Sequence, residues 1–285
     1  MNILITGGLG FIGYNLVKTL TKNENNKIIV IDNLISESSS DDNKIKGVKY
    51  IIGDINDIDD IFFAEKIDVI YHLAGLARIQ PSFDNPLHYM KANIMGTAKI
   101  CEFAKNNDSK IIYAGSSSAF GGHLLNPYSF SKYQGEELCK LYSKIYGVST
   151  VIARFFNVYG DRQPTKGKYA TLIGIFEDTT LRNQPLTITS DGEQRRDFTH
   201  VEDICDGLIT LSEGEYCGEI YSIGSGTNYS VNEIADMFGG EVKYTPKRRG
   251  EAKNTLAENS TLRKLGWLPK KNIKDYINKF KNEHK

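Results

Sequence analysis

The sequence carries no excess of charge of either sign, because 35 lysines and arginines are balanced by 35 aspartates and glutamates. A chain without a basic block lacks the charge pattern of nucleic-acid-binding proteins, so we expect no nucleic-acid partner. Long apolar runs are also missing, since stretches such as Val69–Ala77 fall far below the ~18 residues that cross a bilayer. We therefore expect no membrane partner, and Met1–Ile5 lacks the basic segment of a signal peptide.

Cysteine and proline are scarce, with 4 and 7 residues respectively in a chain of 285. Because no two cysteines form a CxxC pair, the pattern predicts reduced thiols, no metal site and a cytoplasmic protein. The 40% of hydrophobic residues is enough for a large core, and the length predicts roughly two domains. The four cysteines are Cys101, Cys139, Cys205 and Cys217.

What is present is an alternation of apolar runs of strand length with amphipathic helical stretches. Near-continuous apolar runs are typical of strands covered on both faces, so the alternation predicts an α/β fold with a doubly wound parallel sheet. The predicted strands are Ile3–Ile5, Ile28–Ile31, Val48–Ile52, Val69–Leu73, Lys110–Ala114 and Val151–Ala153. The predicted helices are Phe11–Thr21, Asp57–Glu65, Pro86–Lys105 and Tyr128–Tyr146.

The regular alternation of strands and helices ends after Arg154, where a loop rich in glycine, proline and aromatics begins. We expect residues 1–156 to form the sheet domain, with the chain returning to it at about 201–224. Residues 157–200 and 225–285 then form a smaller α/β region. Its predicted elements, together with the returning segment, are Ala170–Arg182, Pro185–Thr189, Asp197–His200, Val201–Ser212, Ile220–Ile223 and Val231–Phe238.

A glycine motif follows the first strand and opens the first helix, with Gly7, Gly10 and Gly13 spaced three apart. The first glycine allows a tight turn, the second lets a pyrophosphate approach the backbone, and the third lets helix and strand pack. Phe11 and Ile12 then begin the helix, whose free N–H groups attract phosphate. A glycine-rich turn without a ligand is the alternative, but the strand–turn–helix context favours a dinucleotide.

Asp32 closes the second strand, 19 residues after Gly13. A carboxylate there accepts hydrogen bonds from both ribose hydroxyls and repels a 2′-phosphate, which favours NAD over NADP. The alternative is a turn aspartate, because Asp32–Asn33 is also good turn chemistry. Asp54 and Ile55, which end the third strand, are candidates for contact with the adenine.

Tyr128 and Lys132 lie four residues apart, on one face of a predicted helix. A free tyrosine is a poor base at neutral pH, but a nearby cation stabilises its phenolate. Ser116 directly follows the strand Lys110–Ala114, so it belongs to the sheet edge where the strand ends converge. It can hydrogen-bond the same substrate hydroxyl as Tyr128. The alternatives are a solvated helix face and a polar loop.

Together these pieces resemble the extended short-chain dehydrogenase/reductase superfamily, in its nucleotide-sugar epimerase/dehydratase branch. The resemblance covers nearly the whole chain, and the ordered set of motifs is highly specific. Beyond the residues above, it rests on Asp32-Asn33-Leu34, His72-Leu73-Ala74-Gly75, Asn93 with Gly96-Thr97, Arg154 to Gly160, Asp191 to Val201, and Arg248-Arg249-Gly250-Glu251.

The resemblance implies an enzyme that oxidises a sugar hydroxyl, usually at C4, with tightly held NAD. By matching position, Tyr128 is the base, Lys132 its modulator and Ser116 the hydroxyl partner. The cofactor would also contact Asn33, Leu73, Ala74, Gly75 and Asn93. On the substrate, Asn157 would contact the diphosphate, Arg196 and Arg248 would clamp the phosphates, and Glu251 would hold the nucleotide ribose. Surface salt bridges with Asp197 and Glu251 are the alternative for the arginines.

The serine segment discriminates between reactions of this branch. Dehydratases and decarboxylases carry a carboxylate two positions after the catalytic Ser or Thr, whereas Ser117 and Ser118 stand here, within reach of the substrate. The pattern predicts reversible C4 epimerisation of a nucleotide diphosphate sugar, with UDP as the commonest carrier. A 4-dehydrogenase, a 4-reductase using external NADPH, and a protein that binds these ligands without turnover stay open.

Three further features bear on the substrate and on assembly. Phe120-Gly121 replaces the usual Tyr-Gly, and only Gly122–Pro127 joins it to Tyr128, where relatives have a longer loop that helps wall the sugar site. By the resemblance, Thr255 falls where galactose-type epimerases often carry a bulky side chain that blocks 2-N-acetyl groups, so we expect room for an N-acetylhexosamine. An ordinary strand residue is the alternative. The long helices predict a homodimer, with a two-sided buried helix as the alternative. The candidate seam residues are Leu87, Met90, Ile94, Leu138 and Leu141.

Overall fold

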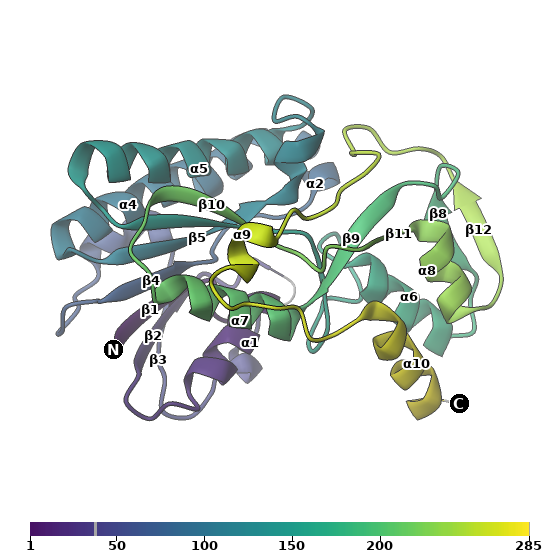
Figure 1. The fold of residues 1–285 in the computed structure, drawn as a ribbon, viewed down its shortest axis with the longest axis horizontal. Helices are drawn as coiled ribbons and strands as arrows, with labels where there is room; N and C mark the ends of the chain where they lie inside the picture. Colours follow the sequence, from purple (N-terminus) through teal and green to yellow (C-terminus); the bar gives the residue numbers. More distant parts are fainter. Residues whose placement is uncertain (37–38, 285) are drawn as a thin grey trace.

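A seven-stranded parallel sheet forms the centre of the computed structural model, which describes residues 1–36 and 39–284 (Figure 1). Its strand order is β10-β6-β5-β4-β1-β2-β3, so the chain order reverses beside β1. This confirms the predicted doubly wound fold. The strands are β1 (Asn2–Thr6), β2 (Lys27–Asp32), β3 (Lys49–Ile52), β4 (Val69–His72), β5 (Lys110–Ser116), β6 (Thr150–Phe155) and β10 (Cys217–Ile223).

Helices cover both faces of the sheet (Figure 1). On one face, α1 (Phe11–Leu20) and α7 (Val201–Ser212) bury side chains such as Leu16 and Leu208 in one apolar core. On the other, α4 (Gly96–Asn107) and α5 (Pro127–Tyr146) contribute Ile100 and Cys139 to a second core. Before α4 come α2 (Ile79–Asp84), α3 (Pro86–Met90) and a π-helical turn, Lys91–Met95.

A smaller region packs at the end of the sheet where the parallel strands terminate (Figure 1). Aromatic side chains such as Phe176 and Phe238 form its separate core. Its strands are β7 (Asn157–Tyr159), β8 (Leu186–Thr189), β9 (Arg195–His200), β11 (Asn228–Ser230) and β12 (Val242–Thr245), and its helices are α6 (Leu172–Leu181), α8 (Val231–Phe238) and α10 (Ile273–Glu283). The short α9 (Ser260–Arg263) packs against β10. The proposed domain boundaries themselves stay predictions.

Most elements begin and end within a few residues of the sequence predictions, and α7 and α8 match them at both ends. The predicted helix Asp57–Glu65 is wrong: a 3₁₀ helix, Ile55–Asp60, is followed by irregular chain. The reason is that the apolar side chains do not share one helical face: Ile58 is fully buried, whereas Phe62, four residues later, is 82% exposed. The predicted helix Pro86–Lys105 is present but is interrupted by the π-helical turn.

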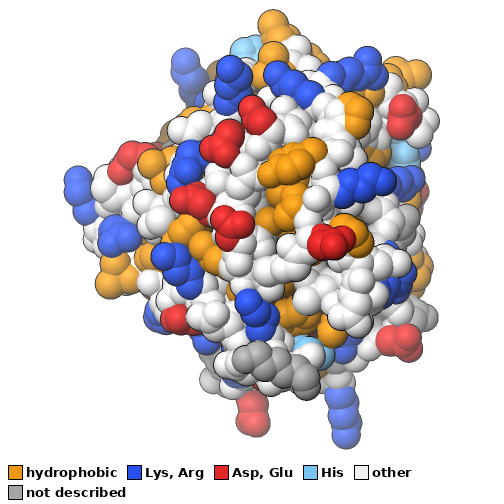
Figure 2. Space-filling model, turned by 90° about the vertical axis from the view of Figure 1, so that its right-hand side faces the viewer, with side chains coloured by type: hydrophobic (Ala, Val, Ile, Leu, Met, Phe, Trp, Pro, Cys, Tyr) orange, Lys and Arg blue, Asp and Glu red, His pale blue; other side chains and the backbone are white. Residues whose placement is uncertain are grey.

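The surface and the cysteines add three observations. On the face shown in Figure 2, basic and acidic side chains are interspersed rather than gathered by sign. All four cysteines are free, as predicted, and only Cys217 is exposed. Within residues 1–36 and 39–284, no helix is long and apolar enough to cross a membrane.

Candidate active site

A cavity of about 950 Å³ lies between the carboxyl ends of the parallel strands and the smaller region. This is the crevice in which open α/β sheets bind ligands. Of the residues predicted from the sequence to contact cofactor or substrate, all line this cavity except Asn93. The structure therefore brings together side chains that are up to about 250 positions apart in the chain.

The glycine loop lies at one end of the cavity. Packing against protein atoms requires glycine at two of its three positions, but not at the third. A Cβ on Gly13 would lie 2.1 Å from the Gly7 carbonyl oxygen, and a Cβ on Gly7, at φ 72°, would lie 2.8 Å from the Ala74 nitrogen. At Gly10 the nearest protein atom would be 3.4 Å away, an ordinary contact. The protein itself leaves room at Gly10, so close approach of a pyrophosphate accounts for the glycine. The loop fits NAD.

Asp32 closes β2 with its carboxylate turned into this end of the cavity. One oxygen accepts from the Leu9 N–H at 3.0 Å and the other from the Leu34 N–H at 2.9 Å. Burial raises the pKa of this carboxyl, while the backbone N–H groups oppose the shift. The hydrogen bonds of the turn alternative are therefore present, and binding of the ribose by Asp32 stays a prediction. Asn33 donates to Asp54 at 3.1 Å on the same wall.

Asn93 is the exception among the predicted cofactor contacts. It is buried behind the wall, where its Oδ1 accepts from the Leu76 N–H at 2.7 Å. Its Nδ2 donates to the Leu76 carbonyl at 3.0 Å and to the Ser131 Oγ at 2.9 Å. Because both ends of the amide are used, Asn93 fixes the chain after β4 and does not face the cofactor.

The three predicted catalytic side chains meet in the middle of the cavity. The Tyr128 hydroxyl donates to the Ser116 Oγ at 3.1 Å, across the gap between α5 and the end of β5. Lys132 lies one helical turn further along α5, with its Nζ 4.2 Å from the ring centroid of Tyr113. The arrangement places a phenol, a hydroxyl and an ammonium around one point where a substrate hydroxyl can bind.

Burial acts on both titratable members of this trio. It raises the pKa of Tyr128, while the hydrogen bond between Tyr128 and Ser116 and the positive charge of Arg78 lower it. It lowers the pKa of Lys132 to about 8, while the negative charge of Glu136 raises it. Tyr128 therefore holds its proton until further positive charge arrives, and the oxidised nicotinamide ring would supply that charge.

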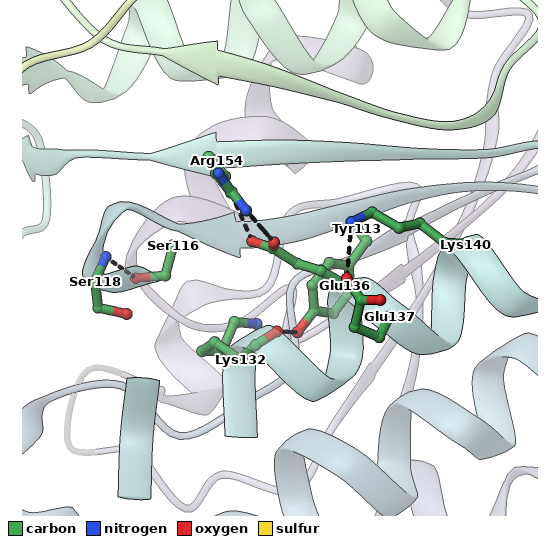
Figure 3. A network of polar contacts seen from close by, with 8 residues as sticks. All are labelled: Tyr113, Ser116, Ser118, Lys132, Glu136, Glu137, Lys140 and Arg154. Atoms are coloured by element: carbon green, nitrogen blue, oxygen red, sulfur yellow. Dashed lines mark hydrogen bonds and ion pairs between the residues drawn. The ribbon is translucent and has the colours of Figure 1, made fainter. Parts of the chain in front are cut away.

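Glu136 is a functional neighbour that the sequence did not reveal. Its side chain is fully buried on α5 and accepts from the Arg154 Nε at 3.0 Å and Nη2 at 2.6 Å (Figure 3). The guanidinium thus binds both oxygens of the carboxylate. Lys132 lies one helical turn from Glu136 on α5. Arg154 was noticed only as the start of a motif, because the pairing joins α5 to β6 and leaves no local spacing signal.

The far end of the cavity holds the predicted substrate residues. The Arg196 Nη2 on β9 lies 3.8 Å from the Glu251 Oε2. This long ion pair agrees in part with the alternative that the arginines form salt bridges. Among residues 1–36 and 39–284, Asp197 pairs with no arginine, and its carboxylate accepts from the Ser225 and Gly226 N–H groups at 2.8 and 2.9 Å. Asn157 and Arg248 complete this wall.

Two buried hydroxyls in the cavity wall have no partner. Neither the Oγ of Ser118 nor the Oγ1 of Thr255 makes a hydrogen bond within the part of the chain that the structure describes. Unsatisfied buried hydroxyls are rare, so their orientation fits a polar ligand. Thr255 is not in a strand, since it follows an isolated bridge between Asn254 and Arg195.

The short Gly122–Pro127 loop does not line the cavity. Asn126 instead caps α5, accepting from the Ser129 N–H at 2.7 Å, and donates to the Gly250 carbonyl at 2.9 Å. Other segments also contribute to the cavity wall, and they were not predicted from the sequence because they carry no motif. It includes Arg78, Gln80, Lys168 and Tyr169.

Comparison with known proteins assigns the chain to a family. Residues 3–224 match the NAD dependent epimerase/dehydratase family. The chain belongs to this family. It is 36% identical to a putative UDP-glucose 4-epimerase of Methanocaldococcus jannaschii over 99% of both chains, and 31% identical to UDP-glucuronic acid decarboxylase 6 of Arabidopsis thaliana over 96% of this chain and 86% of that one.

Among solved structures, UDP-glucose 4-epimerase of Thermotoga maritima with UDP-glucose superimposes with a TM-score of 0.92 at 28% identity, covering 99% of each chain. Family and fold together establish a nucleotide-sugar enzyme that uses NAD. Because the relatives include decarboxylases as well as epimerases, they do not select one reaction.

Proposed function

We propose that this protein is an NAD-dependent UDP-sugar 4-epimerase that works through a transient 4-keto sugar. The observation that carries the proposal is the Tyr128–Ser116 hydrogen bond of 3.1 Å, with Lys132 one turn away and no carboxylate at positions 117 and 118. Water loss needs an acid on the leaving hydroxyl and a base at C5. Ser117 and Ser118 can serve as neither, so these two positions supply no acid or base for a dehydratase step.

Each residue of the trio has a defined part in the reaction. Tyr128 takes the proton of the C4 hydroxyl, Ser116 holds that hydroxyl in position, and the charge of Lys132 stabilises the phenolate. The glycine loop and Asp32 would hold NAD, which would supply a reversible hydride acceptor for C4. The keto sugar turns its other face between the two transfers, and Tyr128 gives the proton back. No external reductant is consumed, which distinguishes this reaction from a 4-reductase. The carboxylate of Asp32 also disfavours NADPH, by charge.

The carrier nucleotide is proposed from the relatives, whose names specify UDP-sugars. Arg196, Arg248 and Glu251 lie at the end of the cavity away from the glycine loop, where a second nucleotide would bind. Two arginines suit a diphosphate because guanidinium groups bind phosphate oxygens in pairs.

We also propose a homodimer that pairs α3 and α5 of each subunit with those of its partner. Of the five predicted seam residues, Leu87 is 82% exposed and Leu141 is 49% exposed, whereas Met90, Ile94 and Leu138 are half-buried. Ile145 and Tyr146 extend the exposed apolar surface at the end of α5. Burial of such a surface favours association.

The test is turnover of a panel of UDP-, GDP-, CDP- and dTDP-sugars by the wild type and by Tyr128→Phe. We expect an epimerised UDP-sugar, no net NADH, and a loss in the variant of at least the ~10²–10⁴-fold typical of general acid–base catalysis. A keto-deoxy product would instead establish a dehydratase. Accumulating NADH would establish a dehydrogenase, and near-normal activity of Tyr128→Phe would remove Tyr128 as the base.

A further inference from the structure

Arg78 places a guanidinium in the cavity wall without a counter-ion. Its Nε donates to the Tyr169 carbonyl at 3.0 Å. Its two terminal nitrogens make no hydrogen bond or ion pair with any residue in the described ranges, 1–36 and 39–284. Burial lowers the pKa of Arg78, yet arginine keeps its proton at neutral pH. Arg78 is half-buried, and a partly desolvated charge without a counter-ion favours an incoming anion.

The backbone at Arg78 is held in an unusual conformation. Its φ is 86°, in the left-handed region that side chains with a Cβ rarely occupy. Five other described non-glycine residues have positive φ, and none of them lines the cavity. The hydroxyl of Tyr89 secures the turn by donating to the Ala77 carbonyl at 2.7 Å. Strain of this kind persists where the surrounding structure enforces it, and it gathers at binding sites.

The position of Arg78 relative to the other groups identifies which part of the substrate it faces. Tyr89 donates to the carbonyl of Ala77, the residue before Arg78, and its ring centroid lies 6.2 Å from that of Tyr128. Arg78 and Tyr128 therefore line the same part of the cavity, and the positive charge of Arg78 also lowers the pKa of Tyr128. The surrounding phenols cannot neutralise it, because burial raises the pKa of Tyr89 as well as that of Tyr128. The phosphate-binding candidates, Arg196 and Arg248, belong to the smaller region, on other segments of the wall.

We propose that Arg78 selects an anionic sugar, namely a nucleotide-linked sugar that bears a carboxylate within reach of its two free terminal nitrogens. The planar fork of a guanidinium matches the two oxygens of a carboxylate. That carboxylate is either the oxidised C6 of a hexuronate or an acid linked to the ring through an ether. The proposal rests on the proposed function and names the substrate class of the same site.

Two matched pairs of ligands test the charge selection on the NAD-loaded protein. UDP-glucuronate is compared with UDP-glucose, and UDP-N-acetylmuramate with UDP-N-acetylglucosamine, by calorimetric Kd and by kcat/KM. A charge-assisted pair predicts that one acid is preferred over its neutral counterpart by about 10- to 100-fold. The pair that shows the preference identifies the source of the carboxylate.

Variants assign the effect to Arg78. Arg78→Gln should bring the ratio close to one and leave the Kd of UDP unchanged, which also shows that the variant is folded. Arg78→Lys should keep part of the ratio, because the charge remains without the fork. The matched control is Arg162→Gln, a positive-φ arginine outside this cavity, which should keep the full ratio.

The outcomes separate this proposal from the function on which it rests. A wild type that prefers neither acid, or an Arg78→Gln variant that keeps the ratio, overturns the charge selection. An equal loss of affinity for UDP itself would assign Arg78 to the diphosphate and overturn it too. Preferential binding of an acid without epimerisation would refute the reaction and leave the selection standing. Failure of every UDP ligand to bind would refute both.

Discussion

Glu136 sets the charge of Lys132, and its removal should move the pH profile of the enzyme. Burial lowers the pKa of Lys132 to about 8 even though the Glu136 carboxylate raises it, and the same carboxylate raises the pKa of Tyr128. In Glu136→Gln both pKa values fall. The base then loses its proton at lower pH and the lysine loses its charge at lower pH, so both limbs of the kcat/KM profile should move towards acid.

The size of the effect follows from the spacing of the two charges. Opposite charges one helical turn apart in a buried site shift a pKa by about 1 unit. With Lys132 at a pKa of about 8 in the wild type, its charged fraction at pH 7.5 would fall from about three quarters to about one quarter. On the alkaline limb, which Lys132 sets, the ratio of variant to wild-type kcat/KM should be about 0.3 at pH 7.5 and about 0.1 at pH 9, and on the acid limb, which Tyr128 sets, it should exceed one.

The assay is epimerisation of the best UDP-sugar between pH 6 and pH 9, with thermal melting to check the fold of each variant. Glu137→Gln is the control, because Glu137 is the next residue on α5 and pairs with Lys140 at the surface, 2.7 Å away (Figure 3). Its profile should match the wild type. If Glu136→Gln instead lowers activity by one factor at every pH, Glu136 is only structural and the electrostatic reasoning fails.

Three further predictions concern stability, substrate and assembly. His72 is buried between the hydroxyls of Thr6 and Thr97, and burial lowers its pKa to about 3. The folded state therefore excludes a proton that the unfolded chain binds below pH 6.5, and between pH 7 and pH 5 the free energy of unfolding should fall by about 2 kcal/mol more in the wild type than in His72→Gln. If urea titrations show that the free energy of unfolding falls equally in both proteins between pH 7 and pH 5, the prediction is wrong. Thr255→Tyr should disfavour UDP-N-acetylglucosamine relative to UDP-glucose by ~1–3 kcal/mol in kcat/KM, and an unchanged ratio would show that Thr255 is not the gate. Light scattering should give a dimer for the wild type and a monomer for Leu141→Glu with Ile145→Glu, and a monomeric wild type would reject the seam.

The sequence predicted those parts of the site that follow from local spacing or from the edge rule of parallel sheets. Gly7, Gly10 and Gly13 meet at one turn because consecutive residues build it. Ser116 and Tyr128 meet because a strand end and the next helix share the crevice. Both relations can be seen in the order of residues alone.

The residues that sequence reasoning missed depend on contacts between distant segments. No spacing pattern joins Glu136 to Arg154, and a polar pair inside a core contradicts the apolar pattern that predicts the core. A positive φ at Arg78 is unexpected because turn chemistry places glycine or asparagine there. Asn93 was assigned to the cofactor because a motif gives a residue's position but not the direction of its side chain.

The return of the chain to the sheet has a consequence for biosynthesis. Strand β10 pairs with β6, and its last residue is Ile223, so β6 lacks its outer neighbour until roughly four fifths of the chain has been made. The core on one face of the sheet is completed later still, when Trp267 has been made. Its indole donates to the Asp203 carbonyl at 2.9 Å and packs in the core with α7. A nascent chain that has reached residue 156 therefore exposes an open strand edge and an uncovered apolar face. We expect it to need a chaperone on the ribosome, and a fragment cut there to aggregate.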